Sequence, residues 1–486
     1  MERLTEFIIV IVYLAVIMLI AYFSLRRVGQ AAVQTDEYYV AGRKVGIFLN
    51  SLAILAALGS GGSFMAGAGT TYLLGIPFTG WMTVGSICGF AISSMLVVRP
   101  LRNSRTYTIT EFLFNRYESQ FIKIAVPIVL LVGSALYLMS QMQAAGMIAS
   151  FLLNWTYAMG MVVTAVIFVI YVAMGGMLAV TWTNALQGGM MVVLVALVTG
   201  GVVVHLDVSP LAFLSSVAEQ APQIGNVGVG ITIVAGIGAF VSWAAATSVM
   251  PHLVMRSLTA TNVHAARISL NVGMLIFGLV MFFMILIAVP FISQLGGGIV
   301  QDYHPDMFLL FVAEEVLSPV LLGLFAAGLL AAVMSTTSGL LLAASASFAY
   351  DLYFKVINPR AEQNKLMLIS RVATLVIGAI CIYFSLTPYD FLVVLYTAAV
   401  GFMVSALFCP LVLGIWWKKA NIPGAITGIL TGSIIFMILF GGFEMPYNTE
   451  VLVALPVSFF SMVVVSLLSE APSEATLNSM EKLHTD

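Results

Sequence analysis

The sequence predicts an all-α polytopic membrane protein with about thirteen transmembrane helices. Of its 486 residues, 61% are hydrophobic and 8% are charged, whereas a soluble domain carries about 25% charged residues. Apolar stretches of about 20 residues, the length that crosses a bilayer core, recur along the whole chain. None shows the alternation of a barrel strand, so helices are the expected spanning elements.

The thirteen apolar stretches form one transmembrane domain over residues 1–468. They cover about residues 7–25, 47–76, 80–98, 122–150, 157–174, 186–206, 229–250, 270–293, 319–348, 367–386, 390–416, 422–440 and 450–468. The first has acids before it and Arg26-Arg27 after it, the reverse of a cleaved signal peptide, so we expect a retained helix. Residues 106–120 are too polar to span and should lie along the interface. The polar tail, 469–486, is expected to be cytoplasmic and disordered.

Basic residues occupy every second gap between the spans, and only Arg3 lies on the other side. The basic gaps hold Arg26, Arg27, Arg43, Lys44, Arg99, Arg102, Arg105, Arg256, Arg267, Lys355, Arg360, Lys365, Arg371, Lys418 and Lys419. The alternate gaps hold Asp207, Glu219, Asp302, Asp306, Asp390, Glu444 and Glu450. Because Lys and Arg stay on the cytoplasmic side of short loops, this pattern predicts a multi-pass protein of the cell (inner) membrane. Its N-terminus should lie outside and its C-terminus in the cytoplasm.

Two spans are interrupted at corresponding places. The second contains Gly59, Gly61, Gly62 and Gly67, and the seventh, five spans later, runs through Trp243 to Pro251. Paired broken helices in two five-helix halves are typical of inverted-repeat transporters and point to the binding site. This predicts a core over about residues 47–416. The alternative is that the glycines only let helices pack closely.

The spans hold essentially no Asp, Glu, Lys or Arg away from their ends, which argues against proton coupling through a membrane carboxylate. All five histidines lie at span ends or in loops and are expected at the surface. The three cysteines are far apart in apolar segments and are interpreted as buried hydrophobes. Since no basic run exceeds a pair, nucleic acid is not an expected partner.

The ninth predicted span contains four consecutive hydroxyl residues, Ser335 to Ser338. A hard monovalent cation prefers oxygen ligands, which unwound carbonyls and hydroxyls can supply without a buried charge. A helix broken at Gly62 and facing Ser335 and Thr336 would provide them. The alternative is that these hydroxyls bond back to their own helix.

Several segments in the same order resemble the sodium/solute symporter family, whose members carry proline, pantothenate, acetate, sialic acid and sugars. The resemblance covers nearly the whole chain. Its most specific segments are AAVMSTTSGLLLAASASFAYDLY (331–353), GGMLAVTWTNALQGG (175–189), PHLVMR (251–256) and CPLVLGIWWKKANIPGAITG (409–428).

The resemblance implies a LeuT-like core of five plus five helices in inverted repeats, flanked by extra helices, with Na+ as the coupling ion. Carried over residue by residue, the family's common sodium site comprises the carbonyls of Gly62, Met65 and Ala332 and the side chains of Ser335 and Thr336. A second sodium site is in doubt, because Asn184 stands where some members have an aspartate and Gly339 where a serine often helps.

The candidate substrate contacts gather around the two breaks. They are Ser60, Ser63, Phe64, Tyr137, Gln141, Gln143, Trp243 and Thr247. The stretches GSFMAGAG (62–69), ALYLMSQMQAAGMI (135–148) and YVAMGGMLAVTW (171–182) look similar to acetate-type carriers. Proline carriers have an Asp where Phe64 stands and a tyrosine where Thr247 stands, although Trp243 and Pro251 match.

Together these features predict a sodium-coupled symporter that imports a small organic monocarboxylate through the lipid bilayer by alternating access. Sodium/pantothenate or sodium/proline symport is the first alternative, and a proton-coupled carrier of the same fold is the second. A channel or sensor would need a continuous polar lining, and only the two breaks supply polar residues. An enzyme is disfavoured because no catalytic grouping lies at membrane depth. The sequence leaves the oligomeric state open.

Overall fold

The computed structural model describes residues 3–29, 34–209, 211–216, 219, 233–295, 304–388, 392–446 and 449–484, and this described part is helical throughout apart from its connections. The first half contains α1 (Leu4–Gly29), α2 (Gln34–Val40), η1 (Ala41–Arg43), α3 (Ile47–Leu58), η2 (Gly62–Ala66), α4 (Gly67–Leu74), α5 (Ile76–Leu96), α6 (Val98–Ser104), α7 (Ile109–Tyr117), α8 (Gln120–Leu153) and α9 (Tyr157–His205).

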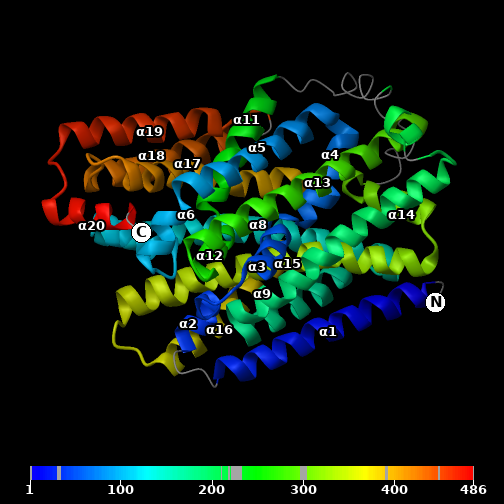
Figure 1. Ribbon diagram of the computed structural model, residues 1–486, viewed down its shortest axis with the longest axis horizontal. Helices are drawn as coiled ribbons and strands as arrows, with labels where there is room; N and C mark the ends of the chain where they lie inside the picture. Colours follow the sequence, from blue (N-terminus) through cyan, green and yellow to red (C-terminus); the bar gives the residue numbers. More distant parts are fainter. Residues whose placement is uncertain are drawn as a thin grey trace.

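The second half contains α11 (Ile233–Val249), α12 (Pro251–Thr259), α13 (Val263–Leu295), η4 (Pro305–Met307), α14 (Phe308–Val316), α15 (Pro319–Ala346), η5 (Ser347–Ile357), α16 (Gln363–Phe384), α17 (Leu392–Trp416), α18 (Ile422–Gly442), α19 (Val451–Leu468) and α20 (Glu474–His484). Figure 1 shows α1 along one long edge of the bundle and α18 and α19 along the other, with α3, α8 and α15 between them. Of these, α15 is almost wholly buried from Phe325 onward, whereas α8 leaves part of its N-terminal half exposed, at Ile124 and Ile128.

α9 is a helical hairpin. Its 49 residues would extend about 74 Å at 1.5 Å per residue, more than twice a bilayer core of about 30 Å. At Gly176 the backbone adopts φ 56° and ψ −156°, a region essentially confined to glycine. On either side of this kink, the Tyr171 hydroxyl donates to the Met334 carbonyl (3.0 Å) and Asn184 Nδ2 donates to the Ser335 carbonyl (3.2 Å). Both arms of α9 therefore lie beside the same turn of α15.

The predicted span number is confirmed within the described residues. Ten helices are long and apolar enough to cross a membrane, and two bent pairs bring the number to 12. Counting the two arms of α9 separately gives the thirteen spans that the sequence predicts. The bent pairs, α3 with η2–α4 and α11 with α12, turn by 59° and 42° and lie five spans apart, as an inverted repeat requires.

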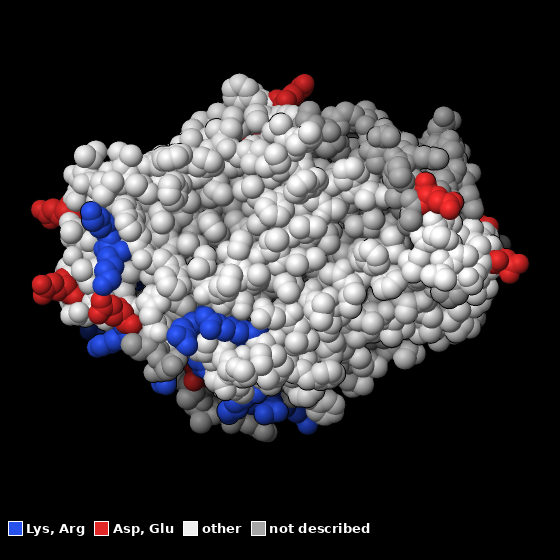
Figure 2. All heavy atoms as spheres, turned by 45° about the horizontal axis from the view of Figure 1, so that its top comes forward, with Lys and Arg blue, Asp and Glu red and all other residues white. Residues whose placement is uncertain are grey.

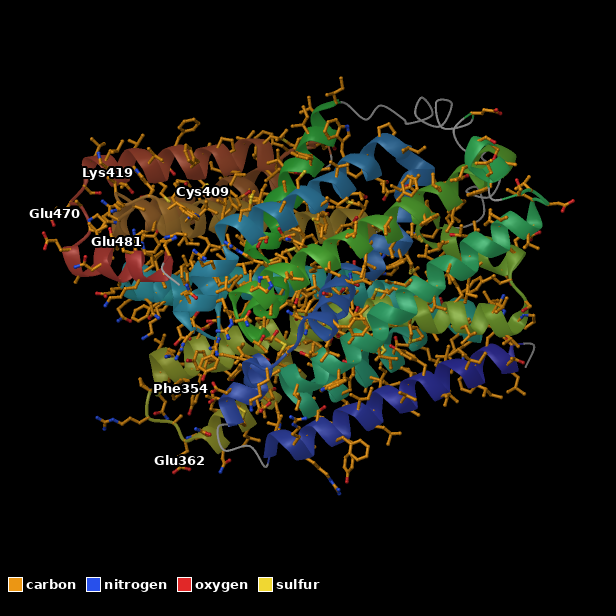
Figure 3. All side chains as sticks on the ribbon, in the orientation of Figure 1. Phe354, Glu362, Cys409, Lys419, Glu470 and Glu481 are labelled. Atoms are coloured by element: carbon orange, nitrogen blue, oxygen red, sulfur yellow. The ribbon has the colours of Figure 1, made fainter. Side chains whose placement is uncertain are left out.

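Charge is distributed unequally between the two ends of the molecule. On the face shown in Figure 2, Lys and Arg gather toward the end that carries α20, and the opposite end displays only acids. Lys419, Glu470 and Glu481 also lie at the α20 end, whereas the buried Cys409 lies within the bundle (Figure 3). Asp302 and Asp390 of the predicted acidic gaps lie outside the described residues.

The tail differs from the expectation of disorder. Glu474–His484 form α20, which attaches to the bundle through its C-terminal half. Lys418 and Glu481 form an ion pair of 2.7 Å, and His484 Nε2 lies 3.1 Å from the Ile415 carbonyl oxygen. Tertiary contacts thus order a segment that is too polar to fold alone.

Candidate functional site

The first break, Gly59–Gly61, frees the carbonyls at the C-terminal end of α3. A helix end leaves its last four carbonyls without intrahelical partners. Gly59 N–H closes the last turn onto the Leu55 carbonyl (2.8 Å). The next three carbonyls accept from side chains: Ala56 from Ser335 (2.7 Å), Ala57 from Thr336 (3.3 Å) and Leu58 from Ser63 (2.9 Å).

Ser335 and Thr336 join the α3 end to α15 in a fully buried cluster. Ser335 Oγ also lies 2.8 Å from the Ala332 carbonyl oxygen and 3.5 Å from that of Gly59. The cluster therefore offers several neutral oxygens from two helices. Among the described residues, no group of three His, Cys, Asp or Glu side chains could hold a metal instead. Neutral carbonyl and hydroxyl oxygens suit a hard monovalent cation.

The hydroxyls of Ser335 and Thr336 lie within hydrogen-bond distance of the carbonyl oxygens of Ala56, Ala57, Gly59 and Ala332. Among the described residues, no hydrogen bond joins this pair to the carbonyls of Gly62 or Met65, which stay predicted ligands. α3 ends at Leu58, so the carbonyls freed at its C-terminal end are those of Ala56 to Gly59. Gly62 lies in the π-helical turn η2, where its carbonyl accepts from Gly67 N–H. Ala332, Ser335 and Thr336 do meet as predicted.

Asn184 occupies the neighbouring position on the second arm of α9. Its Nδ2 donates to the Ser335 carbonyl (3.2 Å), and its Oδ1 accepts from Ser338 Oγ (3.2 Å). Both ends of the amide are thus engaged in bonds to α15. Asn184 thus stabilises the hydroxyl cluster through these two hydrogen bonds and adds no charge to it.

The polar candidates of the first break meet α8. Ser60 Oγ lies 3.2 Å from Ser63 Oγ and 3.4 Å from the Tyr137 hydroxyl. Gly61 N–H donates to Gln141 Oε1 at 3.0 Å. Four predicted substrate contacts, Ser60, Ser63, Tyr137 and Gln141, therefore lie together. Gln143 is buried too, but residues two apart on a helix do not share a face.

An aromatic enclosure connects this group to the second break. The Tyr396 ring of α17 stacks on Tyr137 (centroids 5.9 Å apart) and meets Trp243 edge-on at 6.0 Å. Trp243 Nε1 and, one turn further along α11, Thr247 Oγ1 are buried without a hydrogen-bond partner within the described protein. Phe64 is also fully buried. Sequence reasoning missed Tyr396 because nothing in its own segment marks it; only the tertiary fold brings it to the breaks.

Two residues of α12 correct the sequence analysis. His252 was expected at the surface and Arg256 in a cytoplasmic gap, yet both are buried, with exposures of 1% and 0%. α12 stays within the bundle after a bend of 42°, because Met250 interrupts α11 and Pro251 starts a new helix at its first position. The four-residue spacing of His252 and Arg256 would have been the available signal, since it places both on one helix face.

Comparisons with known proteins agree with this geometry. The family model described as "Sodium:solute symporter family" matches residues 38–432. The chain is 28% identical to a sodium/proline symporter of Haemophilus influenzae, with 92% of each chain covered. It is 27% identical to the high-affinity proline transporter PutP of Bacillus subtilis, over 94% of this chain and 97% of the relative.

Solved structures of low sequence identity share the fold. The substrate-bound outward-open structure of a Na+-coupled sialic acid symporter superposes with a TM-score of 0.81 at 16% identity, covering 97% of this chain and 99% of the other. Mhp1, a nucleobase-cation-symport-1 family transporter, gives a TM-score of 0.57 at 16% identity, over 92% and 98%. These similarities confirm the predicted LeuT-like inverted repeat.

Proposed function

The chain belongs to the sodium:solute symporter family and is a sodium-coupled symporter, and we propose that its solute is proline or a closely similar amino acid. The observation that carries this proposal is the aromatic enclosure of Tyr137, Trp243 and Tyr396 beside the polar groups of the first break. Relatives aligned over nearly their whole length are named as proline carriers, which supports the same choice.

The enclosure suits both ends of a small zwitterion. Ring faces attract a cation within about 6 Å of the centroid, so the aromatic side chains can hold an ammonium group. The hydroxyls of Ser60 and Tyr137 can donate to a carboxylate on the other side. A ring of methylenes, such as that of proline, would pack between them.

An acetate-like monocarboxylate remains the second candidate. None of the predicted substrate contacts is acidic, and Phe64 stands where proline carriers have an aspartate. A bare carboxylate needs no acidic partner. The aromatic enclosure favours the amino acid, because acetate has no cationic end to place against the rings.

We propose that one sodium ion binds between α3 and α15, at the oxygens of Ala56, Gly59, Ala332, Ser335 and Thr336. The hydroxyl pair would then turn its oxygens toward the ion in place of its present bonds to carbonyls. Sodium would hold α3 against α15 and so fix the first break for the solute. Separation of these helices toward the cytoplasm would release both.

The test is uptake of radiolabelled proline and of radiolabelled acetate into proteoliposomes, with and without an inward sodium gradient. We expect sodium-driven accumulation of proline that unlabelled acetate, pyruvate and pantothenate compete for only weakly. Accumulation of acetate alone would overturn the amino-acid assignment. Uptake that follows a pH gradient and ignores sodium would contradict the proposed sodium site.

Trp243→Leu tests the role of the enclosure. Loss of a cation–π contact of about 1–2 kcal/mol should raise the proline concentration for half-maximal uptake by about five- to thirtyfold, and should affect any acetate uptake less. Trp182→Leu is the matched control, because this tryptophan of α9 is 49% exposed on the outside of the bundle. Equal effects of the two substitutions would contradict the assignment.

A further inference from the structure

Arg256 is a buried cation for which the described residues provide no counterion. It is the largest of the fully buried side chains, and its Nη1 donates to Thr181 Oγ1 at 3.1 Å. Nε and Nη2 have no partner, and none of the ion pairs found among the described residues involves it. A guanidinium stays charged and carries five N–H donors, and burying a charge without a partner is costly. Within the described part of the chain, its environment therefore lacks an anion.

His252 lies one helical turn before Arg256 on the same face of α12. It is buried, and its ring lies near the backbone of Ala57, but neither ring nitrogen makes a hydrogen bond of good geometry within the described protein. Its ring lies against Tyr137, with centroids 6.0 Å apart, and Tyr137 in turn contacts Ser60 of the first break. His252 thus connects the candidate substrate site to Arg256.

The far end of α12 reaches the basic cytoplasmic gaps. The Thr259 carbonyl accepts from Val45 N–H (3.2 Å), and the Ala260 carbonyl accepts from Arg102 Nε (2.9 Å). Polar side chains therefore lie along α12 over its whole length. They begin at Ser60 of the first break and end at Arg102, at the end of the molecule where Lys and Arg gather. A negatively charged group that leaves the substrate site in this direction meets His252 first and Arg256 next.

We propose that Arg256 and His252 form a second carboxylate site, on the cytoplasmic side of the substrate site, which the solute occupies as it is released. The proposal rests on the proposed function, because the occupant is the carboxylate of the transported solute. Three unpartnered N–H groups on Nε and Nη2 can donate to carboxylate oxygens, and such charge-assisted bonds are the strong ones. Chloride offers the same negative charge, so the experiment must separate the two sources.

The test compares the two faces of the transporter in membrane vesicles of opposite orientation. In inside-out vesicles, which present the cytoplasmic face, Arg256→Gln should raise the proline concentration for half-maximal uptake by about tenfold or more. The value in right-side-out vesicles should change much less. Arg256→Lys keeps the charge and should restore part of the affinity at the cytoplasmic face. A purely structural arginine would affect both faces alike, which would overturn the proposal.

Arg116→Gln is the matched control for removing a buried arginine. Arg116 is 4% exposed, but its Nε and Nη2 donate to the carbonyls of Gly414 and Ala420 at 2.7 and 2.8 Å, so its donors are already used. This substitution should change the proline concentration for half-maximal uptake equally, or not at all, in the two vesicle orientations. If Arg256→Gln does not insert into the membrane, His252→Gln is the second variant. It should still raise the proline concentration for half-maximal uptake in inside-out vesicles and not in right-side-out vesicles. An unchanged concentration in inside-out vesicles would overturn the proposal.

Chloride replacement distinguishes the two anions, and wild-type uptake tests the proposed function separately. Replacing cytoplasmic chloride by a large sulfonate should lower the cytoplasmic half-saturation value in the wild type, because chloride competes for Arg256. If uptake instead requires chloride, and Arg256→Gln removes that requirement without changing proline affinity, the occupant is chloride and the solute assignment is wrong. Absence of sodium-driven proline uptake in the wild type would contradict the proposed function itself.

Discussion

At the residue scale, the first break leaves backbone carbonyls without partners in their own helix, and side chains of another helix bond to them. The carbonyls of Ala56 and Ala57 accept from Ser335 and Thr336 of α15, so the hydroxyls already lie where an ion would need them. At the proposed site, sodium binding would exchange these hydrogen bonds for ion–oxygen contacts. Since the oxygens come from two helices, the exchange acts directly on how α3 and α15 fit together.

Asp306 is a buried acid on the opposite side from the basic gaps. Its Oδ2 accepts from Leu392 N–H at the start of α17 (2.9 Å) and lies 3.5 Å from His304 Nδ1. Burial raises the pKa of the Asp306 carboxyl to about 6, although the Leu392 hydrogen bond and His304 act against the rise. This carboxyl is therefore more stable in its neutral form in the folded protein than in the unfolded chain.

A pH-dependent contribution to stability follows from this shift. An acid with a raised pKa contributes stability that is complete below its unfolded pKa, near 3.8, and is lost as the pH rises through about 6. Asp306→Asn should remove that part of the pH dependence. Thermal midpoints of the purified wild type and variant between pH 4 and 7.5 measure it, and parallel curves would contradict the prediction.

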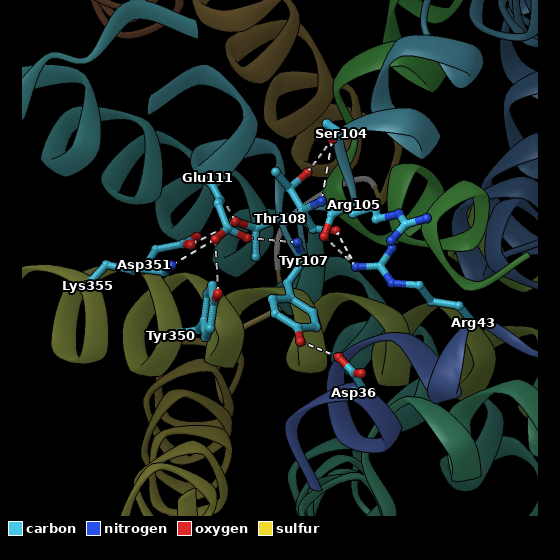
Figure 4. A network of polar contacts seen from close by, with 11 residues as sticks. Asp36, Arg43, Ser104, Arg105, Tyr107, Thr108, Glu111, Tyr350, Asp351 and Lys355 are labelled. Carbon is cyan, nitrogen blue, oxygen red and sulfur yellow. Dashed lines mark hydrogen bonds and ion pairs between the residues drawn. The ribbon is translucent and has the colours of Figure 1, made fainter. Parts of the chain in front are cut away.

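At the scale of elements, segments distant in sequence are joined at the end of the molecule where Lys and Arg gather. Glu111 of α7 accepts from Tyr107 N–H (2.9 Å) and from the Tyr350 hydroxyl of η5 (3.0 Å), and it pairs with Lys355 (2.8 Å). Tyr107 also donates to Asp36 of α2. Figure 4 shows this network linking α2, α7 and η5. It holds together the segments that would have to part for cytoplasmic release.

The α9 hairpin depends on the backbone of one residue. A Cβ at Gly176 would lie 2.5 Å from the Tyr38 ring, at a φ of +56°. Gly176→Ala should therefore destabilise the protein by about 1–3 kcal/mol, seen as a lower thermal midpoint. Gly189→Ala, in open space on the same helix, is the control and should be neutral or stabilising. Equal midpoints for both variants would contradict the strained kink.

At the scale of the whole molecule, the charge asymmetry implies one orientation. We propose that the end carrying α20 faces the cytoplasm and that Arg3, which pairs with Glu314 of α14, lies outside. In a cysteine-free background, Glu314→Cys should react with an impermeant maleimide in intact cells, and Lys419→Cys only after permeabilisation. The reverse labelling pattern would contradict this orientation.

The sequence predicted the spans and both breaks because apolar length and glycine clustering are local properties. It predicted Ser335 and Thr336 because their run is unusual in a span. It did not place the carbonyls of Ala56 and Ala57 beside that pair, because the end of α3 at Leu58 depends on tertiary contacts. Arg256 was assigned to a gap because its neighbours are polar, and only the bend between α11 and α12 brings it into the core.

The most direct test of the account is the sodium dependence of uptake when both Ser335 and Thr336 are replaced by alanine. Each hydroxyl lost from the ion removes a contact with a charge, so the sodium concentration for half-maximal uptake should rise by about tenfold or more. Thr337→Ala, whose hydroxyl bonds back to Val333 of its own helix (2.7 Å), should leave it nearly unchanged. An unaltered sodium requirement in the double variant would contradict the proposed ion site between α3 and α15.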